Sequence, residues 1–419
     1  MEATPPSSAP LDKKYTFCKI ETVDIYIKRK LEDQIQKYHK SREAIVVTGF
    51  RSVGKTALMQ NIYKSINSKN KLFLDLESPV NQKIFNEKNY DNIAKAFASY
   101  GIDTTQQSFI FIDEIQMLKS TTSIVKYLYD HYNFKFYLTG SSSFYLRNYF
   151  SESMAGRKFI FELYPLDFEE FLRFKKERLT INAPYDLLSG LYKEYIQYGG
   201  FPSVVLASSI EQKILALDNI LGSYFELDVK NLSDFRNNEN LKKLLFLLAS
   251  RVGSKLEITK LSESLNVSRP TVYEYLSFFE QTYLIHLLRP FSGSRDIQIK
   301  SIPKLYFNDT GILNRVSQMS LGHLFENKVF NQLYTKNKYL RPNKFLEETL
   351  SYYQAKSGSE IDFIERGQLG YEVKVNAVAR DYAKLIKAGE KINLKDYKIV
   401  SLESTELVKD KKAVYPFGI

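Results

Sequence analysis

Short apolar runs alternate with amphipathic stretches through the first 177 residues of the chain. The apolar runs have the length of buried strands and lie at residues 44–48, 72–76, 109–112, 134–138 and 159–163. Helical periodicity fills most of the intervals around them, including residues 28–40 and 55–66. Buried strands that alternate with helices are typical of a doubly wound α/β fold with a parallel sheet. We therefore predict a parallel sheet covered by helices.

The pattern changes beyond this region. It becomes mostly helical, with a break at residues 199–202, and then shows three helical segments followed by an extended pair. The last part is mainly β, with a helix or two. The small, Ser/Pro-rich start of the chain predicts a disordered tail and not a signal peptide. The expected organisation is a tail at 1–14, an α/β domain at 15–177, a helical lid or linker at 178–238, a helix-turn-helix region at 239–292 and a second α/β domain at 293–419.

The turn after the first apolar run has phosphate-binding chemistry. It reads GFRSVGKT and lies between a predicted strand and a predicted helix. Its glycines let backbone N–H groups curl around a phosphate, and the helix that begins at Lys55 directs its positive dipole end to the same place. Lys55 is expected to reach the β- and γ-phosphates of ATP, and the Thr56 hydroxyl to ligate Mg²⁺. The predicted ATP-binding residues are Gly49, Phe50, Arg51, Ser52, Val53, Gly54, Lys55, Thr56 and Ala57.

Two carboxylates end the third apolar run. We expect Asp113 to hold the Mg²⁺ shell and Glu114 to polarise the attacking water as a general base. Ser141 follows the fourth run and could position that water, although a plain Gly/Ser loop explains it as well. Arg157 could stabilise charge on a γ-phosphate from a neighbouring subunit, and a surface salt bridge is the equal alternative.

Four segments together resemble a known family. They read TGFRSVGKTALM, FIFIDEIQ, YLTGSSSFYL and SMAGRKFIFELYPLDFEEF. They are similar to the AAA+ ATPases of bacteria and archaea that carry a C-terminal domain of unknown function, and the resemblance covers nearly the whole chain after residue 15. It implies a P-loop NTPase fold, Mg-ATP, and the roles given above to Lys55, Thr56, Asp113 and Glu114. Because such ATPases often work as rings, it also implies a homo-oligomer.

A helix-turn-helix is predicted in the third region. A short helix at residues 258–267 precedes Ser268, which caps a second helix with Pro270 near its first position. The segment LSESLNVSRPTVYEYLSFFEQTYLI resembles a winged helix-turn-helix with its wing at residues 284–291. If the module binds double-stranded DNA, the residues expected to face the major groove are Arg269, Thr271, Tyr273 and Glu274. That surface is not strongly basic, so docking of a protein partner remains open.

Near the end of the chain, acidic residues follow a pattern typical of nucleases. Glu326 lies on a predicted helix, Asp362 on a strand, and Glu372 and Lys374 on one face of the next strand. Two carboxylates and an amine can bind Mg²⁺ and activate water against a phosphodiester. The arrangement resembles the PD-(D/E)xK restriction-endonuclease-like core, which implies Asp362 and Glu372 as metal ligands and Glu326 and Lys374 as their catalytic partners. A degenerate core without activity, or unrelated surface carboxylates, are the alternatives.

The composition of the chain is consistent with this interpretation. The formal net charge of +11 and the pI near 9.2 favour polyanionic partners or a lysine-rich soluble surface. The single cysteine, Cys18, excludes an internal disulfide framework and suits the cytoplasm. No apolar stretch approaches the roughly 20 residues of a membrane-spanning helix. We predict a cytoplasmic, Mg-dependent AAA+ ATPase that binds DNA and could cleave it; the alternative is an ATP-dependent switch or docking protein that cuts nothing.

Overall fold

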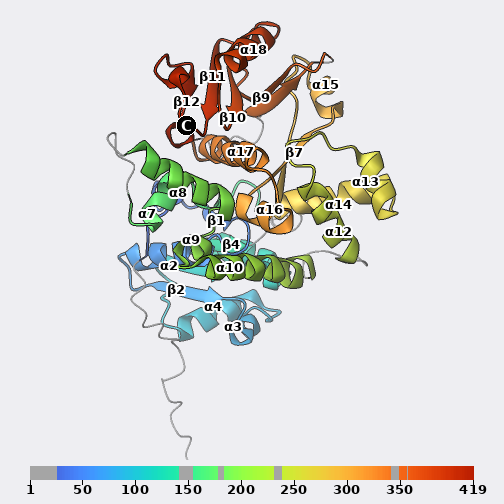
Figure 1. The fold of residues 1–419 in the computed structure, drawn as a ribbon. Helices are drawn as coiled ribbons and strands as arrows, with labels where there is room; N and C mark the ends of the chain where they lie inside the picture. Colours follow the sequence, from blue (N-terminus) through green and yellow to red (C-terminus); the bar gives the residue numbers. More distant parts are fainter. Residues whose placement is uncertain (1–25, 141–153, 178–183, 231–237, 341–348, 356) are drawn as a thin grey trace, which may run out of the picture.

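A five-stranded parallel sheet forms the N-terminal part of the molecule (Figure 1). The computed structural model describes residues 26–140, 154–177, 184–230, 238–340, 349–355 and 357–419. The strand order is β2-β3-β4-β1-β5. The strands are β1 (Ala44–Thr48), β2 (Lys71–Asp75), β3 (Ser108–Asp113), β4 (Phe134–Gly140) and β5 (Lys158–Glu162). The predicted doubly wound α/β fold is confirmed, and each predicted strand lies within two residues of its observed bounds.

Helices cover both faces of this sheet. They are α1 (Lys30–Gln36), α2 (Lys55–Ser65), α3 (Pro79–Ile84), α4 (Tyr90–Ser99), the 3-10 turn η1 (Ile115–Met117) and α5 (Thr121–His131). Every residue of β1 and of β4 is buried. Alternate β1 residues face opposite sides, so Val47 packs in the cluster that includes Leu58 of α2, and Val46 in the one that includes Leu128 of α5. The continuous apolar runs in the sequence follow from this two-sided burial.

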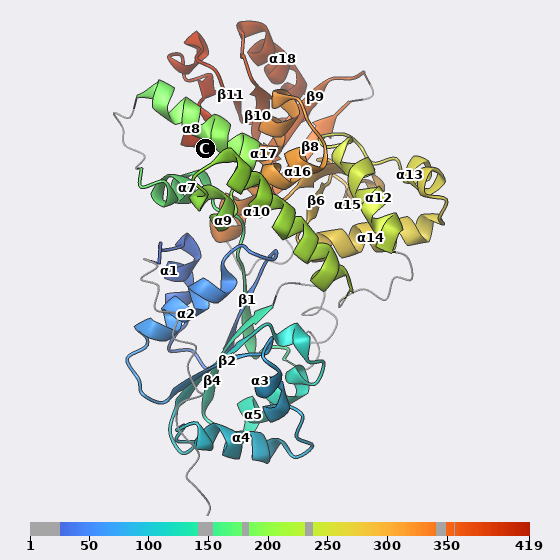
Figure 2. The same cartoon turned by 60° about the horizontal axis from the view of Figure 1, so that its bottom comes forward.

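A helical layer separates the N-terminal sheet from the C-terminal part. It consists of α7 (Phe168–Phe174), α8 (Tyr185–Tyr198), α9 (Pro202–Leu206), α10 (Ile210–Ser223) and the π-helical turn η2 (Tyr224–Val229). Figure 2 shows α9 and α10 between the two sheets. The predicted break lies at the end of α8, where Gly199 has φ +79° and an added Cβ would lie 2.0 Å from Asp309 Oδ1. A side chain there would push the chain away from Asp309.

Three helices and a hairpin follow. They are α12 (Asn238–Ala249), α13 (Ile258–Leu265), α14 (Arg269–Gln281), β6 (Ile285–Leu288), α15 (Arg295–Lys300) and β7 (Lys304–Phe307). Ser268 caps α14 by accepting a hydrogen bond from the Thr271 N–H at 3.2 Å. Strand β6 pairs antiparallel with β7. The hairpin therefore extends past residue 293, and its second strand lies in the segment assigned from the sequence to the last domain.

A second five-stranded sheet, in the order β12-β11-β10-β9-β8, forms the C-terminal part. Strands β8 to β10 pair antiparallel, and β10 to β12 pair parallel. The elements are α16 (Thr310–Val316), α17 (Leu321–Leu340), β8 (Leu350–Gln354), β9 (Glu360–Glu365), β10 (Leu369–Lys374), α18 (Ala379–Glu390), β11 (Asp396–Ser401), η3 (Glu406–Val408), β12 (Ala413–Val414) and η4 (Pro416–Gly418). Figure 1 shows α17 beneath this sheet, toward the helical layer.

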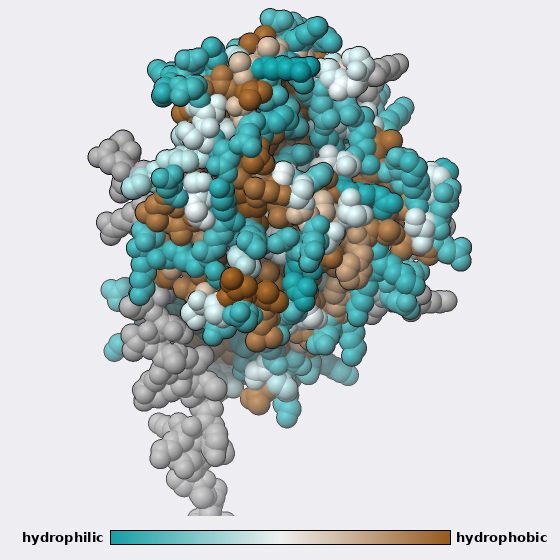
Figure 3. Space-filling view, viewed as in Figure 1, coloured by the Kyte–Doolittle hydropathy of each residue, from teal (hydrophilic) through white to brown (hydrophobic). Residues whose placement is uncertain are grey.

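The face of the molecule shown in Figure 3 is largely hydrophilic, with apolar side chains in separate groups. Exposed apolar residues on α9 and α10 include Leu206, Ile210 and Leu215. Among the described residues, no helix combines the length and the apolar character that crossing a membrane requires.

Candidate functional site

The P-loop connects the end of β1 to the start of α2. Residues 49–54 form the loop, and Lys55, Thr56 and Ala57 open the helix. An added Cβ at Gly49 would lie 2.1 Å from the carbonyl oxygen of Leu163, so only glycine fits there. The Lys55 ammonium donates to the carbonyl oxygens of Gly49 at 3.0 Å and Phe50 at 3.1 Å. The loop thus curls around the lysine that the sequence assigns to the phosphates.

Burial is the main influence on the pKa of Lys55. The side chain is 4% exposed, and this burial lowers its pKa, whereas the nearby carboxylates of Glu114, Asp228 and Asp113 oppose the shift. A buried lysine without an anionic ligand is costly, because its charge has lost most of its water. A phosphate bound in the loop would add a counter-charge in direct contact with the ammonium.

A buried ion pair, which sequence reasoning missed, supports the loop from outside. Arg29 donates to the carbonyl oxygens of Val53 and Tyr164, each at 2.7 Å, and to Glu170 Oε1 at 3.0 Å. Arg29 is 2% exposed and Glu170 is fully buried. The pair joins the P-loop, the segment after β5 and α7. Glu170 lies 141 residues from Arg29 in the sequence, and no local pattern links the two.

Asp113 is the last residue of β3 and Glu114 follows it. Asp113 accepts a hydrogen bond from the Thr139 hydroxyl of β4, and burial raises its pKa, while hydrogen bonds from Thr139 and Thr56 oppose that shift. The Thr56 side chain thus lies close to the Asp113 carboxylate. Both offer the hard oxygen ligands that Mg²⁺ prefers, so this donor set fits the ion.

Glu114 has a strained backbone and a fixed side chain. Its φ of 54° and ψ of 51° lie in the left-handed region, and its N–H donates to the Thr139 hydroxyl at 3.1 Å. The Gln116 amide donates to the Glu114 carboxylate. A non-glycine residue in this conformation is uncommon and often occurs at functional sites. The sequence pattern gave no hint of the roles of Thr139 and Gln116.

The π-helical turn η2 also reaches the P-loop. Arg51 donates through Nε to Asp228 Oδ2 at 2.9 Å, and the ring of Phe50 stacks on Tyr224 with 5.2 Å between centroids. The Tyr224 hydroxyl lies 2.7 Å from Thr282 Oγ1 at the end of α14. A single turn therefore contacts the nucleotide loop on one side and the helix-turn-helix region on the other.

Arg157, predicted to act at an ATP site, does not reach the P-loop of its own chain. Ser141 lies outside the described residues. Arg157 pairs with Asp130 at 3.0 Å, and its carbonyl oxygen accepts from Ala44 N–H, at the start of β1. The P-loop follows the opposite end of β1, about 15 Å away by strand length. Within one chain, Arg157 lies at the edge of the sheet remote from the loop.

The predicted reading surface of the helix-turn-helix is largely exposed. Arg269, Tyr273 and Glu274 are exposed on α14, and Thr271 is half-buried beside the capping Ser268. On α13, Lys260 pairs with Glu257 at 2.7 Å. The surface carries both signs of charge, as the sequence indicates.

The C-terminal candidates converge around the start of β9. Asp362 accepts a hydrogen bond from the Val373 N–H at 2.8 Å, and Lys374 pairs with Glu372 Oε1 at 2.7 Å. Burial, together with the charge of Asp362, raises the pKa values of Glu326 and Glu372 to about 7. The predicted residues thus share one electrostatic environment.

Three further residues, which the motif does not contain, complete this cluster. Tyr306 of β7 donates to Glu326 Oε1 at 2.7 Å, and Lys304 Nζ lies 3.9 Å from the same oxygen. Lys304 also forms an ion pair with Glu360. Within the described ranges, no group of three or more His, Cys, Asp or Glu side chains is arranged to hold a metal ion. The carboxylates of this cluster fit a divalent cation only if the Lys304 ammonium moves away from Glu326 and Glu360.

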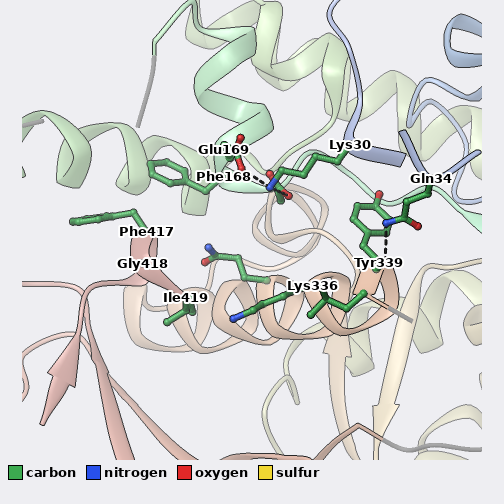
Figure 4. Close-up of a pocket in the computed structure, with 12 residues that line it drawn as sticks. Lys30, Gln34, Phe168, Glu169, Lys336, Tyr339, Phe417, Gly418 and Ile419 are labelled. Atoms are coloured by element: carbon green, nitrogen blue, oxygen red, sulfur yellow. Dashed lines mark hydrogen bonds and ion pairs between the residues drawn. The ribbon is translucent and has the colours of Figure 1, made fainter. Parts of the chain in front are cut away.

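A cavity of about 500 Å³ lies between the N-terminal part and α17 (Figure 4). Lys30 and Gln34 of α1 face Lys336 and Tyr339 of α17 across it, and Ile419 lies at its rim. Gln34 donates to the Tyr339 carbonyl oxygen at 2.7 Å. None of the residues predicted as a site lines this cavity.

Comparisons with known proteins match two parts of the chain to family models. Residues 41–172 match an AAA domain, and residues 189–322 match a domain of unknown function. An uncharacterized protein of Methanocaldococcus jannaschii is 30% identical over 416 residues, covering 94% of this chain and 88% of the relative. An uncharacterized protein of Haemophilus influenzae is 26% identical, covering 87% and 92%.

Among solved structures, the Walker-type ATPase PABY2304 of Pyrococcus abyssi is similar. Its TM-score is 0.46 at 13% identity, and the match covers 70% of this chain and 96% of that one.

Proposed function

The chain belongs to the same family as the Methanocaldococcus jannaschii protein and contains an AAA-type P-loop ATPase domain, and from this premise we propose that it hydrolyses Mg-ATP. The observation that carries the proposal is the P-loop curled around the buried Lys55, with Asp113 held by Thr139 and close to Thr56. Glu114 follows directly, held by Gln116. Phosphate ligand, ion ligands and a candidate base therefore lie together at the ends of β1 and β3.

The chain's own residues account for the proposed reaction. Lys55 exchanges the carbonyl oxygens of Gly49 and Phe50 for phosphate oxygens, which removes the penalty of its burial. Hydroxyl donors favour the anionic form of Asp113 and oppose the effect of burial on its pKa, and Glu114 accepts a proton from the attacking water. When bound, Mg²⁺ supplies charge neutralisation on the phosphates. Release of inorganic phosphate from ATP by the purified chain, with and without Mg²⁺, tests the proposal.

We also propose that double-stranded DNA is a partner of the winged helix. Support comes from the exposed α14 surface around Arg269 and Tyr273 and from the net charge of +11. Phosphate contacts release counterions, so binding should weaken steeply as salt rises. The rival is an ATP-dependent docking protein, for which the mixed charges of α13 and α14 are the support. Salt-dependent DNA binding separates these two proposals.

Assembly into a homo-oligomeric ring is a further part of the proposal. Arg157 lies at the far edge of its own sheet from the P-loop, so it could serve only the ATP site of a neighbouring subunit. Its pairing with Asp130, with both side chains about one-third exposed, is equally consistent with a surface salt bridge.

Metal-dependent DNA cleavage by the C-terminal cluster is a second candidate function. The observation that favours it is the convergence of Glu326, Asp362, Glu372 and Lys374, with Glu372 Oε2 buried and without a hydrogen-bond partner. Asp362 and Glu372 would hold the ion. The Lys304 ammonium opposes this candidate. Cleavage of plasmid DNA with Mg²⁺ or Mn²⁺, compared between wild type and Asp362→Asn, tests it.

A further inference from the structure

The position of strand β7 is fixed by contacts that involve no charge. The Asn327 side chain of α17 accepts from the Phe307 N–H and donates to the Phe307 carbonyl oxygen, both at 2.8 Å. The Tyr306 ring stacks on Phe330 with 4.4 Å between centroids. On the β8 side, the Tyr352 hydroxyl donates to the Ile302 carbonyl oxygen at 2.6 Å. Strand β7 is therefore packed into the C-terminal core. These contacts fix the backbone position of Lys304, its first residue.

At that place Lys304 is buried among carboxylates. It is 4% exposed, pairs with Glu360, and lies 3.9 Å from Glu326 Oε1. Burial alone would lower its pKa, but Glu326, Asp362 and Glu360 together raise the pKa above its ordinary value. The side chain therefore carries its charge at neutral pH. Its ammonium also lies 5.4 Å from the centroid of the Tyr352 ring.

We infer that Lys304 is a built-in cation of the C-terminal carboxylate cluster and competes with a divalent metal ion for it. An ammonium fixed beside Glu326 and Glu360, with the charge of the proposed metal ligand Asp362 also acting on it, offsets the negative charge that would attract a metal ion to the cluster. It also repels a second cation in a poorly solvated place. Lys374 likewise offsets the charge of Glu372, through its ion pair with Oε1. The inference rests on the cluster proposed above as a cleavage site, and it is independent of the ATPase.

The competition can be measured on the full, nucleotide-free chain with Mn²⁺ as the probe. Lys304→Met keeps most of the length of the side chain and removes its charge. We expect this variant to bind Mn²⁺ at least tenfold more tightly than wild type by calorimetry. Its melting point should fall without metal and recover with Mn²⁺, because an ion that binds only the folded state stabilises it. Wild type should show little response.

Three control variants test whether the effect depends on the charge at position 304 and whether the ion binds at Asp362. Lys304→Arg retains a cation and should behave as wild type. Lys255→Met, which removes a lysine over the same Tyr352 ring, should do so as well. Adding Asp362→Asn to Lys304→Met should abolish the gain. If Lys304→Met does not fold, Lys304→Gln provides the neutral variant.

Equal Mn²⁺ affinity in wild type and the neutral variant, whether tight or absent, would overturn the inference. ATP turnover, measured in the same preparations, is expected to be unchanged by Lys304→Met. A chain that lacks ATPase activity altogether would contradict the proposed ATPase and leave the metal comparison intact.

Discussion

Arg51 of the P-loop donates through Nε to Asp228 Oδ2 at 2.9 Å, across 177 residues of sequence. The carboxylate is 5% exposed and also adds negative potential at Lys55. Phosphate oxygens bound in the loop would approach the same two cations. We therefore expect the Asp228 carboxylate to compete with nucleotide phosphates for Arg51 and Lys55. Because Asp228 lies in η2, loss of its bond to Arg51 would change the contacts of this turn.

The first prediction follows from this competition. Asp228→Asn should tighten ATP binding about 5- to 30-fold, because a loss of roughly 1–2 kcal/mol of opposing charge favours the phosphates. Fluorescent-nucleotide titration measures the change. Asp218→Asn is the matched control, because it removes an aspartate of α10 that is paired with Arg315 of α16, and it should leave affinity unchanged. Unchanged or weaker binding in Asp228→Asn would exclude the competition.

The second prediction concerns the support of the loop. Glu170→Gln leaves Arg29 buried and without its counter-charge, which should cost about 3–5 kcal/mol of stability. Its neighbour Glu169 is 55% exposed, so Glu169→Gln should change stability by less than about 1 kcal/mol. Thermal unfolding monitored by circular dichroism compares the two variants. Similar melting points would mean that the Arg29–Glu170 pair contributes little.

The third prediction concerns DNA. Replacing both Arg269 and Lys260 with alanine should weaken binding and reduce the slope of log affinity against log salt by about 1 for each lost phosphate contact. Lys243→Ala on α12, which loses a lysine paired with Glu239, is the control and should keep the slope. If the double variant has the same slope as wild type, the DNA contact lies elsewhere or the module docks a protein.

The fourth prediction addresses the ring. If Arg157 serves a neighbouring ATP site, ATPase activity per chain should rise with protein concentration. Mixing inactive Arg157→Ala and Lys55→Ala chains should restore part of the turnover, because one kind of mixed interface keeps an intact site. Disruption of the surface pair through Asp130→Asn should leave the rate unchanged. Proven mixing without recovery would make Arg157 a structural residue.

The contiguous parts of the site could be predicted from the sequence. The P-loop, Asp113 and Glu114 belong to short segments whose strand and helix context is local, so pattern alone locates them. The strands of the N-terminal sheet are also visible as apolar runs, most clearly β1 and β4, which are buried on both faces.

The remaining partners could not be predicted in this way. Arg29, Asp228 and Lys304 reach their sites from segments far along the chain, and each is one charged residue among many. Only tertiary packing brings them together. For Lys304, antiparallel pairing of β7 with β6 places a lysine of this hairpin beside Glu326 and Glu360. A motif search for the carboxylates alone therefore predicts a metal site and misses the cation already there.

The central claim, ATP hydrolysis at the P-loop, is tested most directly by separating nucleotide binding from turnover. We expect Glu114→Gln to bind Mg-ATP as tightly as wild type and to reduce single-turnover hydrolysis at least 100-fold, because an amide cannot accept the proton. Lys55→Ala should lose tight binding. A Glu114→Gln chain that hydrolyses ATP at the wild-type rate would contradict the account.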